Sequence, residues 1–111
     1  MSLRDLDYVV DILAAAHLIQ SFLVGRDRGA FETDLMCQSA VIRQLEIIGE
    51  ATKRLSATFR DNHPEIPWRQ MAGMRDILIH AYDAVDVDEV WNVATQAIPR
   101  LVVQLGPLVS E

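Results

Sequence analysis

The chain has 111 residues, of which 50% are hydrophobic and 23% are charged. This length and balance predict one globular domain over residues 1–111, and they exclude both intrinsic disorder and two separate cores with a cleft between them. The 16 acidic and 10 basic side chains give a net charge of −6, so we expect no general electrostatic binding to nucleic acid or anionic membranes, and any RNA site must be local.

The cysteine and histidine content argues against disulfides and zinc. Cys37 is the single cysteine and the three histidines are scattered, so we expect no internal bridge, no metal site and a reducing, cytoplasmic setting. Residues 1–7 lack the basic start and small-residue cleavage site of a signal peptide. The apolar stretch Ile12–Val24 is interrupted by polar residues and is shorter than the roughly 20 residues that span a bilayer, so we expect a buried helix and no membrane segment.

Apolar residues recur three and four positions apart through most of the chain, which predicts an all-α fold. The first helix is predicted over Leu3–Val24, with Gly25 as its C-terminal stop and a loop over Arg26–Thr33 behind it. Its apolar residues form two faces, which would give it a central position. One face holds Leu6, Val10, Leu13, His17, Gln20 and Val24, and the other holds Tyr8, Ile12, Ile19 and Phe22.

Three further helices are predicted. Thr33 or Asp34 can cap a long second helix that continues to about Phe59 and ends at residues 61–64. The third helix has Pro67 in its first turn and runs toward Tyr82.

The fourth helix follows a polar connection. Asp86 or Asp88 caps its start, and Pro99 is expected to kink it. Four helices of this length fit an antiparallel four-helix bundle.

Basic residues concentrate in the middle of the chain. Residues 43–75 have a positive charge balance, whereas residues 1–42 and 76–111 are acidic. The cations of the middle segment are Arg43, Lys53, Arg54, Arg60, Arg69 and Arg75. They either face RNA phosphates or form a solvated helix surface, and charge alone does not separate these alternatives.

The segment from Arg75 to Tyr82 places a cation, a histidine and a phenol near the predicted end of the third helix. At about 100° per residue, Arg75 and Tyr82 lie nearly in line, whereas Arg75 and His80 lie about 140° apart. One straight helix therefore cannot direct Arg75 and His80 at the same atom. Either the helix ends near His80 or the site combines side chains from two copies across a dimer interface, and we favour both together.

Asp76 precedes His80 by about one helical turn, so its carboxylate can accept a hydrogen bond from the imidazole and favour the charged form. The alternative is that Arg75, Asp76 and His80 form a surface charge cluster without a catalytic role. For the other histidines we expect structural roles: His17 as a core residue bonded to the backbone, and His63 as a turn residue.

The Arg-X4-His-X-Tyr pattern of Arg75, His80 and Tyr82 resembles the HepT-like branch of the HEPN ribonuclease superfamily. Further stretches agree in family order over nearly the whole chain. These are Ala40–Arg43, Leu45–Ala51, Pro67–Arg69, Gly73–Met74, Val87–Asp88 and Val90–Trp91. One departure is Asp76, where many members carry asparagine.

The resemblance implies a dimeric, metal-independent endoribonuclease without cofactors that acts as the toxin of a type II toxin–antitoxin pair. His80 would transfer protons and Arg75 would hold the phosphoryl oxygens, with Asp76 in support, so that RNA is cut to a 2′,3′-cyclic phosphate and a 5′-hydroxyl end. A partner nucleotidyltransferase of the MNT type would neutralise the toxin by attaching AMP to Tyr82.

A different class of function stays open at this point. The chain would then be a non-catalytic helical subunit that positions substrate for the nucleotidyltransferase or scaffolds it, with Arg75 and His80 binding nucleotide phosphate. The net negative charge favours this alternative slightly. A bundle that only dimerises would leave the motif unexplained.

Overall fold

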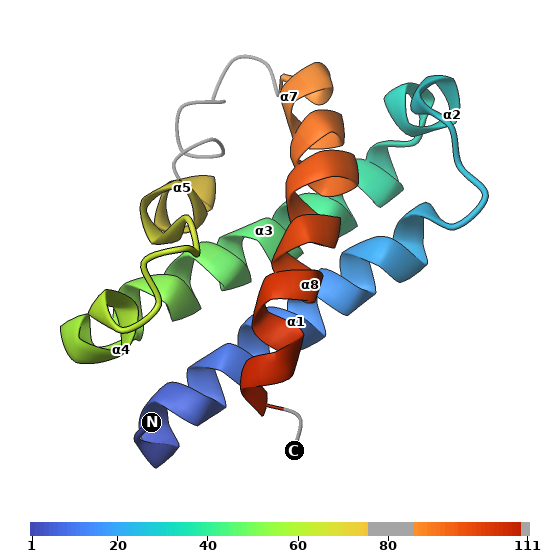
Figure 1. Ribbon diagram of the computed structural model, residues 1–111. Helices are drawn as coiled ribbons and strands as arrows, with labels where there is room; N and C mark the ends of the chain where they lie inside the picture. Colours follow the sequence, from blue (N-terminus) through green and yellow to red (C-terminus); the bar gives the residue numbers. More distant parts are fainter. Residues whose placement is uncertain (76–85, 110–111) are drawn as a thin grey trace.

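The computed structural model describes residues 1–75 and 86–109, without the side chain of Arg75. Every regular element over these residues is helical, which confirms the predicted all-α class (Figure 1). The elements are α1 (Leu3–Leu23), α2 (Arg28–Thr33), α3 (Leu35–Arg54), α4 (Ala57–Asp61), α5 (Trp68–Ala72), the 3₁₀ turn η1 (Gly73–Arg75), α7 (Val87–Asn92), the π-helical turn η2 (Val93–Ala97) and α8 (Ile98–Val109).

Figure 1 shows α1 and α3 side by side and antiparallel, with the column of α7, η2 and α8 crossing over them. The predicted third helix is described only as far as Arg75. The antiparallel four-helix bundle therefore stays a prediction.

α1 begins and ends where the sequence predicts. The Ser2 hydroxyl accepts a hydrogen bond from Asp5 N at 3.0 Å, and Gly25 follows the helix with a φ of +73°, a conformation that favours glycine. By length and composition α1 is apolar enough to cross a membrane, a test that the core helix of a soluble protein also passes. Of the two predicted faces of α1, the second is confirmed, because Ile12 and Ile19 are fully buried and Tyr8 and Phe22 are half-buried.

The first predicted face of α1 is wrong except at Leu13, which is buried. Val10 and Val24 are 48% and 79% exposed, and His17 is exposed instead of lying in the core. The buried residues of α1 are Asp5, Val9, Ile12, Leu13, Ala15, Ala16 and Ile19. Because apolar residues surround most of this helix, their spacing alone does not identify the side that packs against α3 and α8.

The predicted loop over Arg26–Thr33 contains a short helix, α2. The Asp27 carboxylate caps it by accepting from Ala30 N at 2.8 Å. Phe31 is fully buried, with its ring centroid 5.3 Å from that of Trp91 in α7. Because the segment is mostly polar and Phe31 is its one large apolar residue, it has no apolar spacing from which a helix could be predicted.

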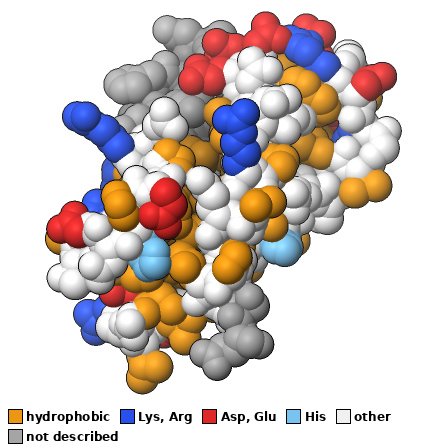
Figure 2. Space-filling view, in the orientation of Figure 1, with side chains coloured by type: hydrophobic (Ala, Val, Ile, Leu, Met, Phe, Trp, Pro, Cys, Tyr) orange, Lys and Arg blue, Asp and Glu red, His pale blue; other side chains and the backbone are white. Residues whose placement is uncertain are grey.

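In Figure 2, basic side chains lie among acidic ones in the region of α2 and α7.

The second predicted helix is divided into α3 and α4. Asp34 caps α3, as predicted, by accepting from Cys37 N at 3.0 Å. The helix ends at Arg54 instead of continuing to Phe59. Ser56 starts α4 because its hydroxyl accepts from Phe59 N at 3.1 Å.

The buried carboxylate of Asp5 holds Ser56 in place. Ser56 N and Ser56 Oγ donate to Asp5 at 2.9 and 2.7 Å, across 51 positions of sequence. Burial by itself would raise the pKa of Asp5, but the hydrogen bonds from Ser56 and Ser2 outweigh it and hold that pKa below the ordinary value of 3.8. The charged carboxylate thus ties the first turn of α1 to the α3–α4 junction.

Replacing this carboxylate should destabilise the fold. Asp5→Ala is expected to lower the free energy of unfolding at neutral pH by about 2 kcal/mol, since it leaves Ser56 N–H without its acceptor. Because the folded-state pKa is lowered, the stabilisation is fully present above the unfolded value near 3.8 and is lost as the pH falls through the folded value. Urea unfolding of both proteins at several pH values measures the difference.

Asp7→Ala, an exposed change on the same helix, is the matched control and should alter stability little. A difference between wild type and Asp5→Ala that grows on acidification would contradict this role of the carboxylate.

The later helices are less regular than predicted. Pro67 directly precedes α5, but α5 gives way to the 3₁₀ turn η1. Asp86 caps α7, as predicted. The kink at Pro99 stays a prediction. The structure has a π-helical turn, η2, that ends two residues before Pro99 and in which Ile98 N donates to Val93 O.

Candidate functional site

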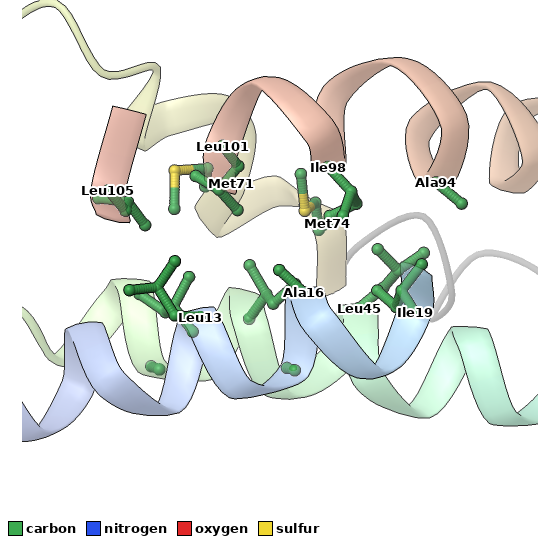
Figure 3. Packing of buried hydrophobic residues seen from close by; sticks show 14 of the residues in the cluster. Leu13, Ala16, Ile19, Leu45, Met71, Met74, Ala94, Ile98, Leu101 and Leu105 are labelled. Carbon is green, nitrogen blue, oxygen red and sulfur yellow. The ribbon is translucent and has the colours of Figure 1, made fainter. Parts of the chain in front are cut away.

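Arg75 ends the η1 turn, and buried side chains hold this turn and α5 on the core. Trp68, Met71 and Met74 are 9%, 1% and 5% exposed. Figure 3 shows Met71 and Met74 directed into the space between α8 and α1. The backbone position of Arg75 therefore depends on apolar packing in the interior.

The other predicted site residues, Asp76, His80 and Tyr82, lie outside the described residues. The Asp76–His80 hydrogen bond and the convergence of Arg75 with His80 stay predictions. The structure does change one premise, because the chain has 3₁₀ geometry over Gly73–Arg75. The 100° per residue of a regular α-helix therefore does not hold up to Arg75.

The start of α7 is held in place by contacts with α2. Arg28 of α2 forms ion pairs with Glu32 of the same helix, at 3.0 Å, and with Asp88 of α7. The Phe31–Trp91 ring contact lies on the same two helices. Residues 76–85 thus connect η1, packed on the core, to a start of α7 that is held by α2.

The remaining histidines differ in their surroundings. His63 lies in the turn between α4 and α5, as predicted, with its ring centroid 4.8 Å from that of Phe59 and its Nδ1 3.6 Å from Glu65 Oε1. His17 is exposed on α1. Neither is a core histidine.

The predicted cations lie mainly on the surface. Arg43 forms an ion pair with Glu46 at 3.4 Å, and Arg54 is exposed. Arg60 and Arg69 line one hollow between α4 and α5. Their proximity could not be predicted from the sequence, because the turn that folds α5 back on α4 brings Arg60 and Arg69 to the same hollow and their spacing gives no sign of it.

A metal site is not found in the described part of the chain. Within residues 1–75 and 86–109, no group of three or more His, Cys, Asp or Glu side chains is positioned to hold a metal ion. Cys37 is free and buried.

Comparison with known proteins gives a consistent set of matches. The model of a family described as "Ribonuclease HepT-like" matches residues 12–107. A Thermococcus cleftensis protein named "Probable ribonuclease HepT" is 50% identical over 95 residues, which cover 86% of each chain. "Putative RNase MJ1380" of Methanocaldococcus jannaschii is 38% identical over 102 residues, which cover 91% of this chain and 94% of that one. No solved structure matches this chain significantly.

Proposed function

Because these matches show that the chain belongs to the HepT-like ribonuclease family, we propose that it is an endoribonuclease whose reaction needs no metal ion. The observation that carries the proposal is the extent of the family match, residues 12–107, which includes Arg75, His80 and Tyr82. The buried packing of α5 and η1 supports it, since a catalytic arginine needs a fixed backbone.

The proposed chemistry uses the RNA's own 2′-hydroxyl as the nucleophile. His80 takes its proton, the 2′-oxygen bonds to the adjacent phosphorus, and the bond from phosphorus to the 5′-oxygen breaks as that oxygen is protonated. Arg75 pairs with the phosphoryl oxygens and stabilises the charge that develops on them. The products are a 2′,3′-cyclic phosphate and a 5′-hydroxyl end.

We further propose that the chain is the toxin of a type II toxin–antitoxin pair and acts on cytoplasmic RNA. Its partner is an MNT-type nucleotidyltransferase that attaches AMP to Tyr82. The added phosphate places negative charge close to Arg75 in sequence and competes with RNA for that arginine.

The active form is proposed to be a homodimer. Apolar side chains on α1 support this, since Leu3, Val10 and Leu18 are 81%, 48% and 44% exposed and would gain from burial against a second copy. Light scattering at micromolar concentration is expected to give twice the chain mass of 12.5 kDa. A stable monomer with full nuclease activity would rule out a site shared between two copies.

Expression of the chain alone tests the toxin role. We expect growth arrest that is relieved by His80→Ala and by co-expression with the proposed MNT-type nucleotidyltransferase partner. A scaffold subunit would arrest growth in neither form, so equal growth of cells with wild type and His80→Ala would favour the non-catalytic alternative.

A further inference from the structure

A hollow of about 620 Å³ lies between α4 and α5, in the part of the molecule that precedes Arg75. Arg60 and Asp61 line it from α4, and Trp68, Arg69 and Ala72 line it from α5. Ala72 is followed directly by η1, which ends at Arg75. The hollow therefore lies next to η1, the turn that ends at Arg75.

Neither arginine of this hollow has an ion-pair partner among the described residues. By contrast, Arg26, Arg28 and Arg43 are each paired with a carboxylate. Arg60 Nε is buried and has no hydrogen-bond partner in the part of the chain that the structure describes. An anion in the hollow would give the guanidinium groups of Arg60 and Arg69 a charge-assisted partner, which the described residues do not supply.

The wall that carries Arg60 is fixed by the indole of Trp68. Trp68 Nε1 donates to Arg60 O at 3.1 Å and to His63 O at 2.9 Å. The Phe59 ring packs between them, with its centroid 5.7 Å from that of Trp68 and 4.8 Å from that of His63. The backbone that presents Arg60 is therefore held in place before any ligand binds, which lowers the entropic cost of binding.

We propose that this hollow binds a backbone phosphate of the RNA substrate, a few nucleotides from the phosphate that is cleaved. The inference rests on the proposed ribonuclease function and adds to it a positioning subsite made by Arg60 and Arg69. Guanidinium groups pair with phosphate oxygens through parallel N–H donors. Asp61 lies in the same hollow and opposes an anion, so it limits the affinity of the subsite.

The test measures the binding and cleavage of a labelled single-stranded RNA about a dozen nucleotides long. Arg69→Gln is expected to weaken binding about fivefold and to lower the slope of log affinity against log salt by about 0.7, the value for one lost phosphate contact with a single strand. It should raise KM with little change in kcat, because the subsite binds substrate without touching the reacting atoms. Arg60→Gln should act similarly.

Asp61→Asn is expected to change RNA binding in the opposite direction from the two arginine variants. Removing this carboxylate should tighten RNA binding about twofold, a gain that a loss of structure would not produce. Arg100→Gln on α8, an exposed arginine outside this hollow, is the matched control and should leave binding within about twofold of wild type.

The outcomes separate this inference from the proposed function. If Arg69→Gln and Arg100→Gln affect binding and the salt slope equally, or Asp61→Asn weakens binding, the phosphate subsite is wrong. If wild type binds RNA and the variants change binding as expected, but wild type does not cleave RNA, the subsite stands and the ribonuclease proposal is wrong. If wild type neither binds nor cuts RNA, both are wrong.

Discussion

Arg75→Ala and His80→Ala are each expected to lower RNA cleavage about 100-fold or more, the scale at which a charge-stabilising donor or a general acid–base group contributes. In the proposed mechanism, Arg75→Ala removes the cation that holds the phosphoryl oxygens, and His80→Ala removes the group that moves the protons. Activity of the wild type is expected to persist in EDTA. Single-turnover cleavage at saturating protein isolates this effect from substrate binding.

His17→Ala is the matched control for the histidine, because His17 is exposed on α1. It should change cleavage by less than about twofold and stability by less than about 0.5 kcal/mol. Unchanged cleavage in both Arg75→Ala and His80→Ala, or loss of wild-type activity on chelation, would refute the assigned chemistry.

Attachment of AMP to Tyr82 is expected to suppress cleavage nearly completely. The phosphodiester carries about one negative charge, which can pair with the Arg75 guanidinium and exclude the RNA phosphate from it. Protein co-expressed with the proposed nucleotidyltransferase partner should gain the mass of AMP on Tyr82, and peptide mass spectrometry locates the modified residue.

Tyr82→Phe removes the acceptor hydroxyl and separates modification from simple complex formation. The variant should remain unmodified and should still cleave RNA and arrest growth in the presence of the partner. AMP on another residue, or normal neutralisation of Tyr82→Phe by the partner, would show that the switch lies elsewhere.

The regular parts of this fold follow from local signals that are readable in the sequence. Gly25 closes α1, and the carboxylates of Asp34 and Asp86 start α3 and α7, because each acts within one helical turn. The break between α3 and α4 escaped prediction for the opposite reason. Ser56 donates hydrogen bonds to Asp5, which lies 51 positions earlier in the sequence. A contact between two polar residues so far apart cannot be predicted from the spacing of apolar residues.

The candidate site was predictable as a motif, whereas its setting was not. Arg75, His80 and Tyr82 are close in sequence, so their spacing and the family resemblance select them as the candidate site. The hollow of Arg60 and Arg69 depends on the turn between α4 and α5, which the Trp68 indole closes by bonding to two backbone carbonyls. Side chains brought together by such a turn show no periodicity that a sequence analysis can use.

The chemistry of the fragment ends tests the central claim most directly. Purified wild type should cut a single-stranded RNA in EDTA to fragments that end in a 2′,3′-cyclic phosphate and begin with a 5′-hydroxyl, identified by mass spectrometry, and His80→Ala should yield almost none. Fragments with 3′-hydroxyl and 5′-phosphate ends, or the same products from His80→Ala at the same rate, would contradict cleavage by 2′-hydroxyl attack at this site.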